Sequence, residues 1–169
     1  MKNSNQTIAI YPGTFDPITC GHTDIIVRSA KIFHTIIVGV ASEGGKKNVL
    51  FSVTERVNFI ANEIERLQLP NVIVKPFEGL LVDFARSENA HTIIRGLRAF
   101  SDFEYEFQLS YINRKLCADL ETILLPATAN CHFISSSWVK EIARFHGQDL
   151  SHFVSDEVAK ALKSAFKSD

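Results

Sequence analysis

Runs of apolar residues alternate with amphipathic segments along the 169-residue chain. Five runs are rich in aliphatic residues, as expected of strands buried in a sheet: residues 7–11, 36–41, 71–75, 92–95 and 122–125. The segments between them place apolar residues three or four positions apart, which is the spacing of amphipathic helices. This alternation predicts a parallel sheet that is covered by helices on both faces and joined by right-handed crossovers.

The clearest predicted helix follows Ser52 and Glu55, which form a capping box at its start. Its expected apolar face consists of Val57, Ile60, Ala61, Ile64 and Leu67. Other helices are predicted after residue 20, near residue 81, over 103–116 and over 155–169. We therefore predict an α/β protein with a Rossmann-like, doubly wound, five-stranded parallel sheet and a C-terminal helix. With no repeat or linker, residues 1–169 form a single predicted domain.

Composition narrows the possible partners. Eighteen basic and nineteen acidic residues give a net charge of −1, so the chain lacks the basic bias of nucleic-acid-binding proteins. No segment approaches the roughly 18 apolar residues of a membrane span, and the polar amino terminus does not resemble an export signal. The three cysteines lack C-x-x-C spacing, which argues against a disulfide framework or a zinc site. We expect a cytoplasmic protein that binds neither nucleic acid nor membranes.

The segment from Tyr11 to His22 carries the strongest chemical signal. It connects a predicted strand to a predicted helix, and the N-terminus of such a helix attracts phosphate. Gly13 and Gly21 have no Cβ, so we expect phosphate to approach the backbone at both. His22 lies in the first helical turn, where it either caps the helix or donates to the anion. The loop matches neither G-x-x-x-x-G-K-[ST] nor G-x-G-x-x-G, which disfavours a P-loop kinase and a dinucleotide dehydrogenase.

Further cationic and hydroxyl groups follow later strands. Lys46 and Lys47 lie in a turn after the second strand, where paired lysines are most often solvated. Arg95 is expected to end the fourth strand, and Gly96 and Arg98 follow it, as expected for an anion site at the sheet edge. The serines at 135–137 include at least one expected helix cap, and Lys140 lies one helical turn on. The three serines together with Lys140 predict a second phosphate site.

Two residues have competing interpretations. Glu106 is either a solvent-facing acid on the helix over 103–116 or a contact to a nucleotide. Cys20 lies beside His22, but no base and orienting partner are recognisable around it, so we do not predict a nucleophile there.

Three blocks of this sequence resemble a known family. Gly13-Thr-Phe-Asp-Pro17 with Thr19-Cys-Gly-His22 resembles the first signature of the nucleotidyltransferases, and Ile134-Ser-Ser-Ser-Trp-Val-Lys140 resembles the second. Ile94-Arg-Gly-Leu-Arg98 with Asp102-Phe-Glu-Tyr-Glu106 is similar to the phosphopantetheine adenylyltransferases of that superfamily. The resemblance spans nearly the whole chain.

The resemblance implies adenylyl transfer from ATP to 4′-phosphopantetheine, giving dephospho-coenzyme A and pyrophosphate. It implies catalytic roles for His22, Lys46 and Arg95. The implied ATP-binding residues are Thr14, Phe15, His22, Gly96, Leu97, Arg98, Glu106, Ile134, Ser135, Ser136 and Ser137. The implied acceptor-binding residues are Thr14, Lys46, Leu81 and Arg95. It further implies Mg²⁺ carried by ATP rather than by protein ligands, coenzyme A as a product-like ligand, and a homohexamer.

One stretch departs from that family. Residues 126–132 lack the aromatic and acidic residues usual before the serine turn, so we expect Asn130 and Cys131 to border the base instead. Other functions also remain open: a sibling transferase that uses nicotinamide mononucleotide or a cytidylyl acceptor, a nucleotide sensor without catalysis, and a flavodoxin-like redox module.

Overall fold

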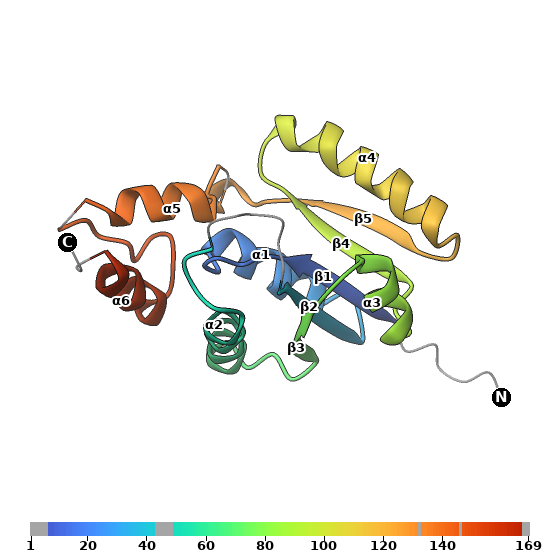
Figure 1. Ribbon diagram of the computed structural model, residues 1–169, viewed down its shortest axis with the longest axis horizontal. Coiled ribbons are helices and arrows are strands. Elements are labelled where there is room, and N and C mark those ends of the chain that lie inside the picture. Colours follow the sequence, from blue (N-terminus) through green and yellow to red (C-terminus); the bar gives the residue numbers. More distant parts are fainter. Residues whose placement is uncertain (1–6, 43–48, 132, 146, 167–169) are drawn as a thin grey trace.

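A computed structural model describes residues 7–42, 49–131, 133–145 and 147–166. Its five parallel strands are β1 (Ile8–Gly13), β2 (Thr35–Ala41), β3 (Val72–Phe77), β4 (Thr92–Leu97) and β5 (Glu121–Pro126). They lie in the order β3-β2-β1-β4-β5, so the strand order reverses between β1 and β4 (Figure 1). In such sheets ligands bind beyond the carboxyl ends of the strands at this reversal. The predicted α/β fold is confirmed.

The helices are α1 (Cys20–Ala30), α2 (Val53–Arg66), α3 (Leu81–Ser87), α4 (Phe100–Leu116), α5 (Ser136–Ala143) and α6 (Asp156–Ala165), with a short 3₁₀ turn η1 (Ala129–Cys131). Several predicted boundaries differ from the structure, and two of the differences bear on the site. The helix expected from Phe103 begins at Phe100, and the fourth strand continues to Leu97, so Arg95 lies within the strand. The β4–β5 ladder extends the strand, since Gly96 and Leu97 pair with Leu125 and Pro126.

Alternation along the strands divides the core between the two faces of the sheet. Ala9, Tyr11 and Val38 belong to the larger cluster, which buries apolar residues of α1, α2, α5 and α6. Ile10 and Ile37 pair in register and point to the opposite face, where the smaller cluster packs against α3. Both faces are therefore covered, which explains why the strand sequences are nearly continuous apolar runs.

The predicted start of α2 is confirmed, but its predicted buried face is partly wrong. Ser52 and Glu55 form the capping box, with the Glu55 Oε2 accepting from the Ser52 N–H at 2.8 Å. Ala61, expected on the buried face, is exposed, whereas Arg56 and Phe59 are buried together with Ile60 and Ile64. The buried stripe thus starts with an arginine, which an apolar pattern alone does not select.

The α4 helix lies along β4 and β5, apart from the larger core (Figure 1). Glu106 is its one buried residue. Its exposed large apolar residues are Phe100, Phe103, Tyr105, Phe107, Tyr111, Ile112 and Leu116. In the part of the chain that is described, no helix is both long and apolar enough to cross a membrane.

Candidate functional site

A cavity of about 800 Å³ opens at the carboxyl ends of the strands, beside the N-termini of α1 and α5. It brings together most of the residues predicted for the site: Thr14, Phe15, His22, Leu81, Arg95, Gly96, Arg98, Glu106, Ile134, Ser135, Ser136 and Ser137. Leu97 is not among the lining residues, and Lys46 lies outside the described ranges. Segments up to 129 residues apart in sequence, from Tyr11 to Lys140, therefore share one cavity.

The loop after β1 is shaped by Phe15, which is buried and has a left-handed φ of 49°. Its ring packs edge-on against Tyr11 and His22, with centroids 5.4 and 5.0 Å away. A Cβ on Gly13 would lie 3.0 Å from the Phe15 ring. The space that we expected at Gly13 for phosphate is therefore occupied by Phe15, so this glycine serves the packing of the loop.

His22 both caps α1 and lines the cavity. The Thr19 backbone N–H donates to His22 Nδ1 at 3.0 Å, and the Thr19 hydroxyl lies 3.0 Å from the same nitrogen. A neutral imidazole that accepts through Nδ1 carries its proton on Nε2. The capping contact therefore fixes the ring in the tautomer whose Nε2 is a donor, so the two interpretations of His22 are compatible.

Arg95 and Glu106 form the central ion pair of the cavity. Arg95 Nε donates to Glu106 Oε2 at 2.6 Å and Nη2 donates to Oε1 at 2.8 Å, while Nη1 donates to the Pro12 carbonyl at 3.0 Å. Burial acts to lower the pKa of Arg95, but the hydrogen bonds and charge of Glu106 outweigh it and raise that pKa overall. Glu106 is thus not a solvent-facing acid. From α4, Glu106 orients the side chain of Arg95 on β4.

The cavity's other acidic residues are paired as well. Asp102 accepts from the Arg98 backbone N–H and from Arg98 Nε, at 3.1 and 3.3 Å. Asp16 is buried and accepts from Lys140 Nζ at 2.6 Å. The cation that we expected beside the serine turn is therefore held by Asp16, at the edge of the cavity.

The serine turn opens α5 as predicted, but two of its hydroxyls serve the fold. Ser135 is the N-cap and accepts from the Trp138 N–H at 3.2 Å. The Ser136 hydroxyl donates to the Pro17 carbonyl at 2.8 Å, which ties α5 to the loop after β1. Ser137 is exposed in the first turn of α5. An anion here would meet backbone N–H groups at the helix N-terminus and the Ser137 side chain.

Gly96 was expected to let a ligand approach the β4 backbone. A Cβ at this position would instead lie 3.2 Å from Ile25 Cγ1 of α1. The missing side chain therefore allows α1 to pack closely on β4 below the cavity.

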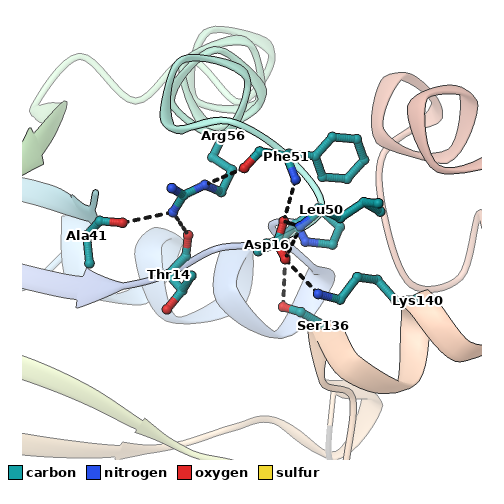
Figure 2. Close-up of polar contacts among 9 residues, drawn as sticks. Thr14, Asp16, Ala41, Leu50, Phe51, Arg56, Ser136 and Lys140 are labelled. Atoms are coloured by element: carbon teal, nitrogen blue, oxygen red, sulfur yellow. Dashed lines mark hydrogen bonds and ion pairs between the residues drawn. The ribbon is translucent and has the colours of Figure 1, made fainter. Parts of the chain in front are cut away.

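Sequence reasoning missed Arg56, whose guanidinium reaches the cavity-lining residues Thr14 and Ala41 without lining the cavity itself (Figure 2). It is 1% exposed and donates to the carbonyls of Thr14, Ala41 and Phe51, at 2.6, 2.9 and 3.1 Å. Its burial lowers its pKa, and the nearby Asp16 opposes that change. The available signal was its position on the buried stripe of α2, four residues before Ile60.

The turn over residues 129–131 does not provide the contacts to a base that we expected from Asn130 and Cys131. Cys131 makes a side-chain hydrogen bond with Cys20, and burial together with this neighbour raises the pKa of the Cys20 thiol to about 12. Neither Asn130 nor Cys131 lines the cavity, whereas Ala127 and Ile134 do. Cys131 therefore points toward α1 rather than toward a base. The raised pKa also agrees with our expectation that Cys20 is no nucleophile.

Comparison with known proteins places these features in a family context. The profile of the cytidylyltransferase-like family matches residues 10–142. A phosphopantetheine adenylyltransferase from Wolbachia sp. subsp. Brugia malayi (strain TRS) is 54% identical over 160 residues, covering 95% of this chain and 94% of the relative. Another from Wolbachia pipientis wMel is 52% identical with the same coverage. The similarity extends over nearly the whole chain.

Solved structures share the fold at much lower identity. A protein from Vibrio parahaemolyticus, assigned as a nicotinate-nucleotide adenylyltransferase, has a TM-score of 0.72 at 18% identity, with 97% of both chains covered. The Plasmodium falciparum nicotinic acid mononucleotide adenylyltransferase complexed with NaAD has a TM-score of 0.71 at 17% identity, with 94% of this chain and 95% of that chain covered. At this identity the likeness concerns the fold alone.

Proposed function

Because the chain belongs to the cytidylyltransferase-like family, and groups there with the phosphopantetheine adenylyltransferases, we propose that it transfers the adenylyl group of ATP to 4′-phosphopantetheine. An oxygen of the acceptor phosphate attacks the α-phosphorus of ATP, and the bond from that phosphorus to the β-phosphate oxygen breaks. The products are dephospho-coenzyme A and pyrophosphate. The identity to named relatives over 95% of the chain carries this proposal.

The reaction places few chemical demands on the protein. A phosphate monoester has a second pKa of about 6, so its attacking oxygen is largely deprotonated at neutral pH and needs no general base. The protein must instead align two anionic substrates and stabilise the charge that develops at the α-phosphate. A cavity with fixed cations and two helix N-termini suits this task.

The ATP half of the proposed site lies around α1 and α5. His22 Nε2 would donate to the triphosphate, with the ring held by its Nδ1 contact to Thr19. The first turn of α5, with Ser137, would bind the same phosphates. The remaining nucleotide contacts would come from Gly96, Leu97, Arg98 and Glu106, together with Ile134, Ser135, Ser136, Thr14 and Phe15.

The acceptor half lies on the side of the cavity formed by Thr14, Ala41 and Leu81. Thr14 and Arg95 would bind the acceptor phosphate together with Lys46. Among the described residues, three of the five N–H donors of Arg95 make hydrogen bonds, which leaves two for an anion. Dephospho-coenzyme A and coenzyme A would occupy both halves as product-like ligands.

We expect Mg²⁺ to arrive bound to the triphosphate, where it neutralises phosphate charge. The acidic residues lining the described cavity are Asp16, Asp102 and Glu106, and each is paired with a cation. They are therefore poorly suited to hold the metal in place of the substrate oxygens.

An acceptor panel tests the proposal. Pyrophosphate release from ATP should require 4′-phosphopantetheine and should be absent with pantetheine, which lacks the attacking phosphate. Release with nicotinamide mononucleotide or nicotinate mononucleotide instead would assign the chain to the sibling activity. ATP binding without release for any acceptor would favour a sensor, and a yellow protein would favour a redox module.

The α4 surface supports a proposal about assembly. Phe100 is 96% exposed, and six further large apolar residues of the helix are exposed with it. So many exposed large apolar residues on one helix are typical of an interaction site. We expect α4 to be covered by other copies of the chain in a homohexamer, in the cytoplasm. Light scattering should give the hexamer mass, and Phe107→Glu together with Tyr111→Glu should lower it.

A further inference from the structure

Arg56 connects three backbone segments that meet behind the acceptor half of the cavity. Its Nη1 donates both to the Thr14 carbonyl, in the loop after β1, and to the Ala41 carbonyl, at the end of β2. Its Nε donates to the Phe51 carbonyl, just before α2. Thr14 and Ala41 line the cavity, whereas Arg56 itself does not.

Asp16 binds the backbone N–H groups of the segment just before α2, which also contains Phe51. Its carboxylate accepts from the Leu50 and Phe51 backbone N–H groups, at 2.9 to 3.1 Å (Figure 2). Arg56 binds the Phe51 carbonyl, so both polar groups of this residue are fixed by opposite charges. Such hydrogen bonds to ionised groups are stronger than neutral ones, and burial increases their strength.

These contacts lie on either side of Lys46 in the sequence. Ala41 precedes it and Phe51 follows it, and Arg56 anchors both to the Thr14 carbonyl. Arg56 thus links the end of β2 and the start of α2 to the loop that carries Thr14, and Asp16 holds Leu50 and Phe51 as well. A buried cation is costly to desolvate, so a role confined to filling the core would be served better by an aliphatic residue.

We infer that Arg56 is a positioning residue for the acceptor phosphate, acting through the carbonyls of Thr14 and Ala41, which line the acceptor half of the cavity. The inference rests on the proposed function, which assigns these residues to the acceptor half. Within the described part of the chain, Arg56 forms its hydrogen bonds with Thr14, Ala41 and Phe51, and none with the serine turn or with Gly96–Arg98, which belong to the ATP half. Its loss should therefore affect the two substrates unequally.

The test uses Arg56→Lys, which keeps the charge but not the planar fork, and Arg56→Gln, which keeps one amide donor and no charge. Steady-state kinetics of pyrophosphate release give KM for each substrate. We expect kcat/KM for 4′-phosphopantetheine to fall about 10–100-fold in Arg56→Lys, and further in Arg56→Gln, because small displacements of a positioned group cost this much. KM for ATP should change by less than about threefold, because, among the described residues, Thr14 is the only one held by Arg56 that is also proposed to contact the nucleotide.

Ile60→Ala provides the matched control, because Ile60 is fully buried one turn further along α2 and belongs to the larger core. Thermal melts of all three variants should show that Ile60→Ala is destabilised at least as much as the Arg56 variants. Loss of folded protein lowers kcat while leaving both KM values unchanged, so Ile60→Ala should show no preference for the acceptor.

Equal losses for both substrates, wild-type kinetics, or failure of both Arg56 variants to fold would overturn the inference and assign Arg56 to the core. Failure of the proposed function is recognised separately, because the wild-type protein would then release no pyrophosphate with 4′-phosphopantetheine. If another phosphate monoester is the acceptor, the same comparison of KM values with that compound still tests Arg56.

Discussion

The two walls of the cavity are built in different ways. The phosphate wall comprises residues 12–16 and Ala41; the buried Arg56 lies behind it, and the buried Asp16 within it binds the segment before α2. The base wall carries more open side chains, such as Tyr105, which is 62% exposed; its lining residues are Arg98, Ser101, Asp102, Tyr105, Ala127 and Ile134. One wall is fixed by buried charges, whereas the other presents much of its side-chain surface to solvent.

This difference matches what each wall is proposed to do. Phosphate transfer depends on donors that are already in place when charge develops, so the phosphate wall benefits from rigid support. A base is recognised by shape and by hydrogen bonds at its edges, and the exposed base wall lies next to the apolar surface of α4. The comparison predicts that changes in the phosphate wall alter rates, while changes in the base wall alter nucleotide affinity and stability.

The largest effect is expected for His22→Ala. This change removes the Nε2 donor proposed to act on the triphosphate, and kcat should fall about 10²–10³-fold, as when one transition-state donor is lost. The melting temperature should change little beyond the loss of the cap at Thr19. A variant that keeps near-wild-type kcat would remove His22 from the mechanism.

Lys46→Ala should weaken binding of 4′-phosphopantetheine more than binding of ATP. Loss of one charge-assisted contact to phosphate costs about 1.5–3 kcal/mol, so affinity for 4′-phosphopantetheine should fall roughly 10–100-fold. Calorimetry should show a smaller change for ATP. Lys47→Ala is the matched control and should leave both affinities close to those of the wild-type protein. Equal losses for ATP and acceptor would contradict the division of the cavity.

Cys131→Tyr tests the base wall. Because Cys131 contacts Cys20, a tyrosine would have to be accommodated in a packed position, at a cost of about 1–3 kcal/mol in the free energy of unfolding. Asn130→Tyr is the control, since Asn130 is exposed, and it should leave urea unfolding unchanged. Unchanged stability with tighter ATP binding in Cys131→Tyr would show that residue 131 borders the base after all.

Ser52→Ala should give the smallest effect. The cap of α2 contributes about 1 kcal/mol, and its loss should lower the free energy of unfolding by that amount at pH 7. The hydrogen bond from Ser52 lowers the pKa of Glu55 below its ordinary value of 4.5. The stabilisation is therefore present above that value and is lost as pH falls through the lower folded pKa. The difference between wild type and variant should shrink in acid, which urea titrations at several pH values would detect.

Local patterns were sufficient to predict much of the fold. Apolar runs marked the strands, and the capping box at Ser52 marked the start of α2. The order of the strands was not predicted, because right-handed crossovers limit the possible orders without selecting one. The site was predicted where a motif placed a group at a strand end, as with His22 and the serine turn.

The remaining features depend on contacts distant in sequence. Arg56 is buried because the carbonyls of Thr14 and Ala41 converge on it, 42 and 15 residues away. Glu106 is buried because β4 brings Arg95 beneath α4. Cys131 points inward because its turn packs on α1. No periodicity within one segment reveals such pairings, although an arginine on an apolar stripe signals that polar partners lie opposite it.

The most direct measurement follows oxygen-18 from the acceptor phosphate. With 4′-phosphopantetheine labelled at its phosphate oxygens, direct attack on the α-phosphorus keeps every labelled oxygen in dephospho-coenzyme A. Mass spectrometry should therefore find all the label in that product and none in pyrophosphate. Label in pyrophosphate, or unlabelled AMP as the main nucleotide product, would contradict adenylyl transfer to the acceptor phosphate.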